Sequence, residues 1–399
     1  MTVVSLGSRA RRNDRRRTTS KRKWIAGEST TNYYLIVIAT GLLLLIGLVM
    51  ILSASSVAAY TQYGSSFLFF KRQALWVALG VTGMVGLSRF DYHRLRPAGW
   101  ALSVIGLLSL MAVLHPAIGT RVSGSSRWIG AGPIRFQPSE LMKLALLIFG
   151  ADAVARRQGK LHTLKSIMVP VGAVAGVAAA LVMMQPDLGT TIVLATIVFS
   201  ILYVGGTSLP LIGAIGFTGL LGATGLSLTE GYRRARLLSF LHPFSDPMNS
   251  GYQAVQSMIA LGSGGTFGVG LGQSRQKWLY VPNAHTDFIF SILGEELGLI
   301  GTIGIVGLFV LIAFAGVRAA KRAPDPFGRL LATGATVWIV GQAFINMGAV
   351  TGLLPITGVP LPLVSFGGSA LVFTLIAVGI LANVARQEKA ASKRSAVAA

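Results

Sequence analysis

The sequence predicts a helical integral membrane protein. Hydrophobic residues make up 52% of the 399 residues and charged residues only 12%, whereas soluble domains carry about 25% charged residues. The mean hydropathy is +0.66. The apolar segments are roughly 20 residues long, which fits membrane-spanning helices rather than the short alternating strands of a barrel. We therefore expect an all-α fold with ten transmembrane helices and a large extracytoplasmic loop between helices 7 and 8.

Ten apolar segments define the expected helices. In chain order they are 33–53, 72–88, 97–114, 138–155, 167–184, 188–206, 209–226, 287–317, 329–349 and 367–385. They imply a ten-helix membrane domain at 33–386 with the large outer loop at 227–286, between tails at 1–32 and 387–399. An even number of spans puts both termini on one side. The segments assigned to the cytoplasm hold more than twice as many Lys and Arg residues as the outer ones, so both termini are expected in the cytoplasm.

Charge and composition exclude several other functions. The net charge is +22, with five His and no Cys, which excludes thiol chemistry and argues against a dedicated transition-metal site. Many of the cations lie in 1–32, which we interpret as a disordered cytoplasmic tail that contacts anionic lipid rather than nucleic acid. The chain has no G-x-S-x-G, Walker or H-E-x-x-H motif, so the common hydrolase, nucleotide and zinc-protease signatures are absent.

Polar residues lead into the fourth expected helix. The stretch 115–140 is rich in Gly, Ser and Pro and is expected to be a loop, with Pro138 near the start of the helix. Glu140 and Lys143 are three residues apart, so they share a helix face and can pair. A charge at the centre of a span costs ~2.5–3.5 kcal/mol. Such a pair could simply pin two helices together, but with Arg135 it also predicts a water-filled cavity open to the outer face.

A second polar region precedes the eighth expected helix. The sequence SRQKWLYVPNAHTDFIFSILGEELG (274–298) places Asp287 where a basic loop meets an apolar helix, with Glu295 and Glu296 deeper in that helix. Carboxylates at a membrane boundary are usually functional. Outward-facing cations predict an anionic ligand such as a phosphate carried on lipid. A carboxylate at the loop–helix junction suits a general base or a ligand of a divalent ion.

Other loop features have structural explanations. A short amphipathic helix is expected to end near Gly262, and the glycine run that follows suggests close backbone approach rather than a nucleotide site. Asp187 could cap the next helix, and Arg127 with Trp128 could be an interfacial anchor. The Pro/Gly-rich segment 353–368 cannot form a regular helix. Such broken backbone is tolerated where it lines a cavity or is buried in protein.

Seven sequence blocks together resemble one bacterial family. They are RFQPSELMK, QPDLGT, HPFSDP, GYQ..QS, GSGGTFGVGLGQS, AHTDFIFSILGEELG and LPLVSFGGS, in this order along the chain. They are similar to the SEDS family of shape, elongation, division and sporulation proteins, typified by FtsW, RodA and SpoVE. The basic N-terminal tail and the HTDFIF–GEELG block look most like the FtsW cell-division branch, although GLLPITGVPLP is also RodA-like. The resemblance covers about residues 33–386.

The resemblance implies a peptidoglycan glycosyltransferase that joins lipid II units at the outer face of the cytoplasmic membrane. In such proteins the GlcNAc 4-hydroxyl of the acceptor attacks the MurNAc anomeric carbon, undecaprenyl pyrophosphate leaves, and the configuration inverts. The essential acid of the family falls on Asp287, as a base or as a ligand of a divalent cation (Mg or Mn). No organic cofactor is implied. The expected partners are a class B penicillin-binding protein, which is a transpeptidase, and other divisome proteins.

The family's functional Arg, Glu and Lys fall on Arg135, Glu140 and Lys143, which would hold the leaving pyrophosphate, with Glu140 orienting Lys143. Additional candidates for substrate binding are Gln137, Gln256, Ser257, Lys277 and His285. Glu295 and Glu296 are expected to be structural. Two other functions stay open, a lipid II flippase and a noncatalytic divisome scaffold. A flippase should need polar groups through the full membrane depth, whereas here they concentrate in the outer half.

Overall fold

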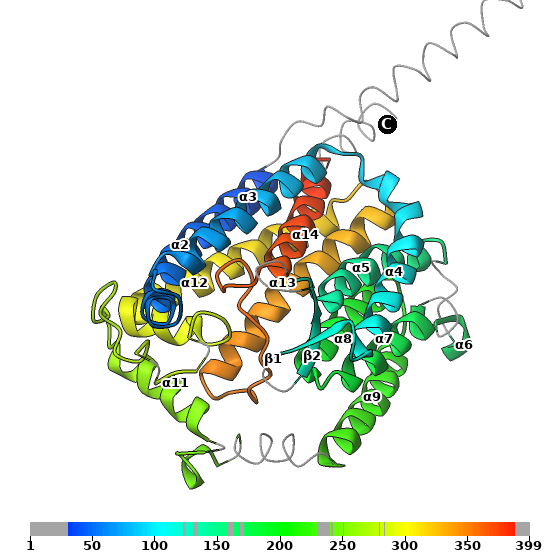
Figure 1. Ribbon diagram of the computed structural model, residues 1–399. Helices are drawn as coiled ribbons and strands as arrows, with labels where there is room; N and C mark the ends of the chain where they lie inside the picture. Colours follow the sequence, from blue (N-terminus) through cyan, green and yellow to red (C-terminus); the bar gives the residue numbers. More distant parts are fainter. Residues whose placement is uncertain are drawn as a thin grey trace, which may run out of the picture.

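The computed structural model describes residues 31–387 apart from 123–124, 131–134, 158–162, 168–170, 230–239, 241, 250, 279 and 283. Both expected tails therefore lie almost entirely outside the described residues. So do the three arginines in the first part of the large loop, Arg233, Arg234 and Arg236. Within the described part the chain is helical with one small sheet (Figure 1), which confirms the helical class.

A helix lies at each of the ten apolar segments in the described part of the chain. The elements are α2 (Thr31–Tyr63), α3 (Leu68–Arg89), η1 (Tyr92–Leu95), α4 (Arg96–Leu114), β1 (Gly119–Val122), β2 (Ser125–Ile129), α5 (Pro138–Ala155), α6 (Leu164–Ile167), α7 (Ala173–Met184), α8 (Leu188–Val204), α9 (Leu209–Thr229), η3 (Pro243–Ser245), α11 (Tyr252–Ser263), α12 (Ile289–Lys321), α13 (Pro326–Val350) and α14 (Ser369–Arg386). Five described stretches are long and apolar enough to cross a membrane: α2, η1 with α4, α12, α13 and α14. The number of ten crossings stays a prediction.

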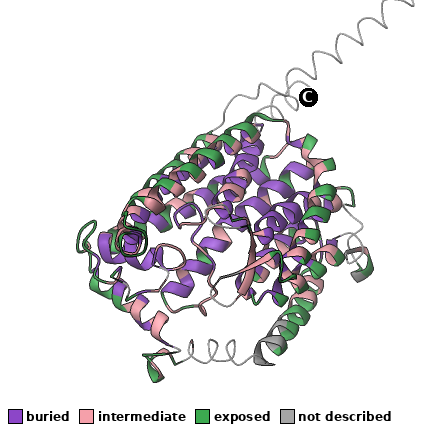
Figure 2. Ribbon diagram, in the orientation of Figure 1, coloured by how far each residue is buried: buried purple, intermediate pink, exposed green. Residues whose placement is uncertain are grey.

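Helices α13 and α14 form the centre of the bundle. In their most apolar stretches 67% and 78% of the residues are buried, against 22% in α12. Helix α14 packs on α3, and α13 packs on α8 and α12. Figure 2 shows the same division, because buried residues fill the middle of the bundle and exposed residues mark the outer helices. Thr336, Gln342 and Asn346 on α13 are buried inside the protein, away from lipid.

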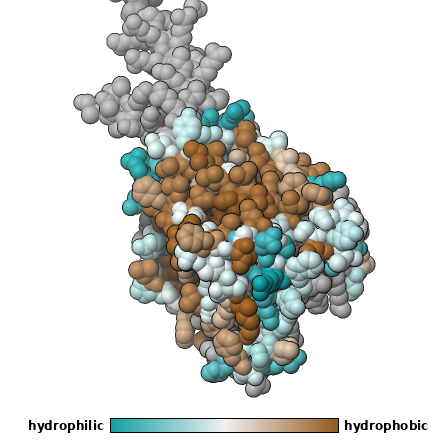
Figure 3. Space-filling view, turned by 90° about the vertical axis from the view of Figure 1, so that its left-hand side faces the viewer, coloured by the Kyte–Doolittle hydropathy of each residue, from teal (hydrophilic) through white to brown (hydrophobic). Residues whose placement is uncertain are grey.

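The outer surface is hydrophobic, as expected for a chain in a bilayer. Helix α2 exposes Ile38, Leu42, Leu45 and Val49. Figure 3 shows a broad hydrophobic area on one face of the molecule, with hydrophilic residues at its upper edge and below it. Such an arrangement fits a band of lipid contact between two water-facing ends.

Helix α12 is interrupted where the sequence predicts a continuous span. Gly298 has φ 65° and ψ −163°, a conformation that favours glycine. The glycine-rich stretch after α11 fills the break: Val269 N–H donates to Glu295 O at 2.9 Å, and Leu299 N–H donates to Gly265 O at 2.9 Å. The backbone groups freed by the break are thus bound by another segment, as burial requires. The glycine run serves as a close-packed structural insert.

The expected loop 115–137 contains an antiparallel hairpin of β1 and β2. The register pairs Gly119 with Ile129 and Thr120 with Trp128, and Ile129 also bridges to Phe136 just before α5. The Gly, Ser and Pro content of this stretch predicts a loop, and the two paired strands within it are an addition to that prediction. The hairpin places the start of α5 next to the turn that precedes α8.

Candidate functional site

Asp287 lies in the turn immediately before α12, as the sequence predicts, and its side chain is half-buried. Its backbone carbonyl accepts a hydrogen bond of 2.8 Å from Asn346 Nδ2 on α13. A Cβ atom placed on Gly358 would lie 3.5 Å from Asp287 Oδ2. The carboxylate therefore sits against the segment 353–368, in close approach to a glycine.

The segment 353–368 lies beside this turn, with Val359 and residues 361–365 buried. Phe366 N–H donates to His285 O at 3.0 Å, and Ser365 Oγ donates to Thr286 O at 2.7 Å. Ser365 O in turn accepts a hydrogen bond of 3.2 Å from Gln73 Nε2 on α3. These contacts supply partners for a backbone that forms no regular helix, which explains how it is tolerated inside a membrane protein.

Glu140 and Lys143 form the predicted pair on α5. Lys143 Nζ lies 2.8 Å from Glu140 Oε2, and the two side chains are 2% and 3% exposed. Lys143 Nζ also donates to Gln342 Oε1 at 2.9 Å and lies 5.1 Å from the centre of the Trp338 ring. A buried ammonium needs such compensation, because desolvation of an unpaired charge costs several kcal/mol.

Helix α13 connects the two halves of the candidate site. Gln342 Nε2 donates to Pro360 O at 3.0 Å, and Asn346 Nδ2 donates to Val359 O at 2.7 Å. Our reading of the sequence missed both amides. A signal was present, because Gln342 and Asn346 are polar residues four apart in an apolar segment, which places them on one helix face.

His285 lies two residues before Asp287 and packs into an aromatic cluster. Its ring centre is 4.8 Å from that of Phe69 and 5.9 Å from that of Phe366. Burial lowers the pKa of the His285 imidazole to about 4, so the side chain is neutral at physiological pH. Its expected contact with substrate stays a prediction.

The other expected binding residues lie in different surroundings. Ser257 is fully buried, with its Oγ 2.8 Å from Ser291 Oγ and donating to Val350 O at 2.7 Å. Gln256 beside it is half-buried. Gln137 is half-buried at the start of α5 and donates its backbone N–H to Ser369 Oγ at 3.3 Å, while Arg135 is exposed. Ser257 therefore joins α11 to the bundle, whereas Arg135 lies at the protein surface.

Glu295 and Glu296 hold the basic loop against α12. Glu295 Oε2 accepts from Ser274 Oγ at 2.5 Å, and Glu295 Oε1 accepts from Arg275 N–H at 2.9 Å. Glu296 Oε1 lies 3.7 Å from the Nζ of Lys277, a side chain that is 6% exposed. Lys277 Nζ also donates to Gly272 O at 2.6 Å. These contacts fit the structural role expected for both glutamates.

Asp187 caps α8, as expected from the sequence. Its Oδ1 accepts from Thr190 N–H at 3.1 Å and its Oδ2 accepts from Thr190 Oγ1 at 2.9 Å. Arg127 on β2 lies 3.5 Å from Asp187 Oδ2 and donates to the carbonyl oxygens of Gln185 and Pro186. Arg127 thus binds the hairpin to the turn before α8.

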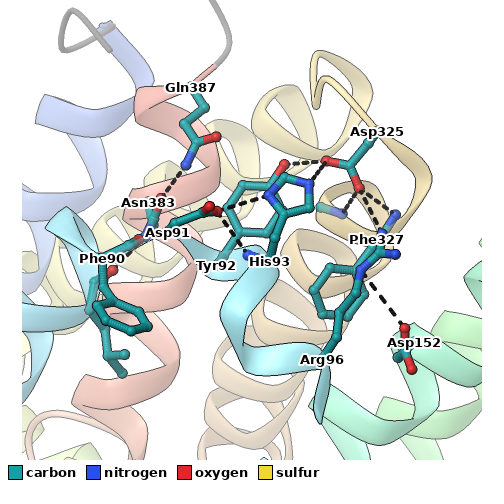
Figure 4. Close-up of polar contacts among 12 residues, drawn as sticks. Phe90, Asp91, Tyr92, His93, Arg96, Asp152, Asp325, Phe327, Asn383 and Gln387 are labelled. Atoms are coloured by element: carbon teal, nitrogen blue, oxygen red, sulfur yellow. Dashed lines mark hydrogen bonds and ion pairs between the residues drawn. The ribbon is translucent and has the colours of Figure 1, made fainter. Parts of the chain in front are cut away.

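A second polar cluster lies at the other end of α13 (Figure 4). Asp325 caps this helix and accepts from the amides of Phe327 and Gly328 at 3.0 and 3.1 Å. His93 Nε2 lies 3.2 Å from Asp325 Oδ2, and Tyr92 donates to the same oxygen. Burial alone would raise the pKa of the Asp325 carboxyl, but hydrogen bonds from His93, Tyr92 and Gly328 lower it to about 2. This cluster joins η1 to α13 at the end that the charge bias assigns to the cytoplasm.

Metal binding is limited by the donors near Asp287. Among the described residues no group of three or more His, Cys, Asp or Glu side chains is arranged to hold a metal ion. Asp287 could serve as the single protein carboxylate for a Mg²⁺ ion, whose remaining ligands are commonly substrate phosphates and water.

Comparison with known proteins shows that the chain is similar to members of one family. The family model FTSW_RODA_SPOVE, described as "Cell cycle protein", matches residues 33–390. The chain is 43% identical over 343 residues to the probable peptidoglycan glycosyltransferase FtsW of Mycobacterium tuberculosis (strain H37Rv), covering 86% of this chain and 66% of that protein. It therefore spans slightly less than two thirds of that relative. It is 43% identical over 344 residues to stage V sporulation protein E of Bacillus subtilis (strain 168), covering 86% and 94%.

Solved structures show the same likeness. A chain of a peptidoglycan synthase complex, described as coordinating polymerization and crosslinking, superposes with a TM-score of 0.73 at 28% identity, covering 88% of this chain and 97% of that chain. The crystal structure of the rod shape determining protein RodA of Thermus thermophilus superposes with a TM-score of 0.65 at 28% identity, covering 88% and 96%. The helical bundle is thus similar to two solved membrane proteins of this kind.

Proposed function

Because the chain belongs to the FtsW/RodA/SpoVE family of cell cycle proteins, also called SEDS proteins, we propose that it is a peptidoglycan glycosyltransferase. Its substrate would be lipid II, which it polymerises into glycan strands at the outer face of the cytoplasmic membrane. The name of the mycobacterial relative supports this activity. The relatives named FtsW also favour a role in cell division.

One observation supports this function above the others. The backbone carbonyl of Asp287 accepts from Asn346 and the buried Lys143 ammonium donates to Gln342, and these two amides on one face of α13 both bind the segment 353–368. A carboxylate and a cation connected through one helix inside a membrane protein suit a reaction that takes a proton from a hydroxyl and releases a phosphate anion.

In the proposed step the 4-hydroxyl oxygen of the acceptor GlcNAc attacks the anomeric carbon of the donor MurNAc. The bond between that carbon and the pyrophosphate oxygen breaks, undecaprenyl pyrophosphate leaves, and the configuration inverts. Asp287 accepts the hydroxyl proton. Arg135 is exposed and can bind pyrophosphate oxygens directly. Lys143 is 2% exposed, so its charge acts on the leaving group through the low dielectric of the interior unless the side chain moves.

A divalent cation fits this scheme with Asp287 as its protein ligand. When bound, such an ion would neutralise charge on the leaving pyrophosphate. The protein's own part is to hold the carboxylate in place, which the contacts of the turn 285–287 provide.

We also propose a class B penicillin-binding protein as the partner, together with other divisome proteins. The similarity to a chain of a complex that coordinates polymerization and crosslinking supports this choice. With both termini in the cytoplasm, Asp287 would face the outer side, where a transpeptidase can crosslink the new strand.

Purified protein, its cognate transpeptidase and lipid II test the proposal. We expect glycan strands on a gel, formed with the transpeptidase domain blocked by a β-lactam, and a lower rate when a chelator removes divalent ions. A flippase would instead move lipid II across vesicle membranes without making glycan, and a scaffold would do neither. Either of those results would refute the glycosyltransferase assignment.

A further inference from the structure

Helix α13 carries two buried amide side chains one turn apart. Gln342 and Asn346 are each 2% exposed. Burying an amide is unfavourable unless its hydrogen-bonding groups find partners. The partners of these two side chains therefore show what the amides hold in place.

Asn346 binds two separate pieces of backbone. Its Nδ2 donates to Asp287 O at 2.8 Å and to Val359 O at 2.7 Å. Because both partners are carbonyl oxygens, only the NH₂ group can face them, and both of its hydrogens are used. The side chain thus ties the turn that carries Asp287 to the segment 353–368.

The turn is held at three consecutive carbonyl oxygens. His285 O accepts from Phe366 N–H at 3.0 Å, Thr286 O accepts from Ser365 Oγ at 2.7 Å, and Asp287 O accepts from Asn346. Two of these donors come from the segment 353–368 and one from α13. Every backbone acceptor of the turn is therefore bound from outside.

Gln342 makes the equivalent connection for Lys143. Its Oε1 accepts from Lys143 Nζ at 2.9 Å and from Trp338 Nε1 at 3.1 Å, while its Nε2 donates to Pro360 O at 3.0 Å. Gln342 and Asn346 therefore bind the adjacent carbonyls of Pro360 and Val359. One face of α13 sets where both ionisable groups lie relative to the same backbone.

We propose that Asn346 is a positioning residue for Asp287, and that its spacing from Gln342 sets the placement of Asp287 relative to Lys143. This inference rests on the proposed function, because it assigns Asp287 a part in the reaction. In the structure Asn346 binds backbone carbonyls, so it acts on the reaction through Asp287. Precise placement matters because a displacement of about 1 Å can lower a rate by roughly 100-fold.

The test variant is Asn346→Asp, which keeps the shape of the side chain but removes both donors. The chain offers a matched control in Asn383→Asp. Asn383 is 1% exposed on α14, and its Nδ2 likewise donates to two backbone carbonyls, those of Leu87 and Phe90. These contacts lie at the end of the bundle away from Asp287. The control therefore measures the general effect of placing a carboxylate at a buried amide position.

Steady-state polymerisation of lipid II gives the first readout. We expect Asn346→Asp to lower kcat by at least about 30-fold with KM within about threefold of wild type, because placement rather than binding is lost. Asn383→Asp should keep kcat within about threefold. Equal losses in the two variants, or a normal kcat in Asn346→Asp, would overturn the proposal.

Hydrogen exchange gives a readout that does not depend on activity. The amides of Phe366 and Leu361 are bound to His285 O and Ser365 Oγ, so in Asn346→Asp they should exchange at least about tenfold faster, and in Asn383→Asp at the wild-type rate. Unchanged exchange in Asn346→Asp would refute the positioning role, even with kcat lost. If the wild type makes no glycan, the proposed function fails, and the exchange rates alone decide whether Asn346 holds the turn.

Discussion

Lys143 is a buried cation that can have a structural role, a functional role or both. It contacts Glu140 and Gln342 and lies near the Trp338 ring. The sequence alone left open whether the pair merely pins helices together. The contacts with α13 show that it does join two helices, so the functional part needs a test of its own.

We expect the single variants Lys143→Met and Glu140→Gln to be less stable than the double variant that combines them. Removing one partner of a buried pair leaves an uncompensated charge and costs about 3–5 kcal/mol, whereas replacing both by neutral groups of similar size restores most of the stability. Thermal unfolding in detergent measures this. Polymerisation should fall at least about tenfold in all three proteins. A double variant that is both stable and fully active would show that the pair has only a structural role.

His285 predicts a pH dependence of stability. Burial lowers the pKa of the folded imidazole to about 4, below the unfolded value of about 6.5. The unfolded chain therefore binds the proton more tightly. The free energy of unfolding is therefore highest above pH 6.5 and decreases as the pH falls toward 4, by at most about 1.4 kcal/mol per pH unit.

The comparison for this effect is His285→Phe, which keeps an aromatic ring next to Phe69 and Phe366. Melting temperatures recorded between pH 7 and pH 4 should fall more steeply for the wild type than for this variant. Parallel curves would show that His285 does not titrate in the fold as described.

At the scale of elements, the sequence predicted most helices, but it did not predict the backbone break in α12 at Gly298 or the segment that packs into it. Hydrophobic length predicts a span because a bilayer demands it, and α11 also ends close to the expected position. The break at Gly298 depends on hydrogen bonds to residues about 30 positions earlier in the chain. Local pattern carries no information on such a partner. The hairpin β1–β2 was missed for the same reason, because it depends on pairing between two short segments and not on the composition of either one.

Gly298→Ala should disturb the inserted glycine run. The added Cβ would lie 2.3 Å from Gly268 N, at a backbone with φ +65°. We expect a loss of about 2 kcal/mol or more, from strain and from displacement of the insert. Gly262→Ala is the matched control, because its Cβ would meet nothing within 4 Å in helix α11. That variant should be neutral or up to about 1 kcal/mol more stable. Thermal unfolding with the opposite ranking would contradict the packing described for the insert.

At the scale of the whole molecule, the sequence identified the ionisable groups of the candidate site but not the hydrogen bonds that connect them. Asp287 and the Glu140–Lys143 pair are conspicuous because charges are rare in spans. Gln342 and Asn346 were missed because an uncharged amide in a helix is common and does not by itself indicate a functional role. Their hydrogen bonds to residues 285–287, to α5 and to the segment 353–368 join parts of the chain that are far apart in sequence.

The orientation of the bundle in the membrane is a prediction that cysteine labelling can test. The chain contains no Cys, so single substitutions need no background removed. Met248→Cys, at a position 79% exposed in the large loop, should react with an impermeant thiol reagent in intact cells or spheroplasts. Arg157→Cys, at an exposed position after α5, should react only after the membrane is opened. The reverse pattern would place Asp287 on the cytoplasmic side and contradict glycan synthesis at the outer face.

The most direct measurement is the rate of lipid II polymerisation by Asp287→Asn, assayed with the cognate transpeptidase beside the wild type. Asp152→Asn is the control, because that carboxylate pairs with Arg156 and Arg96 at the other end of the bundle. If Asp287 takes the proton of the acceptor hydroxyl or holds the cation, its amide variant should lose at least about 100-fold in rate with an unchanged melting temperature, and the control should stay near wild type. Glycan made at the wild-type rate by Asp287→Asn would contradict the catalytic role of this carboxylate.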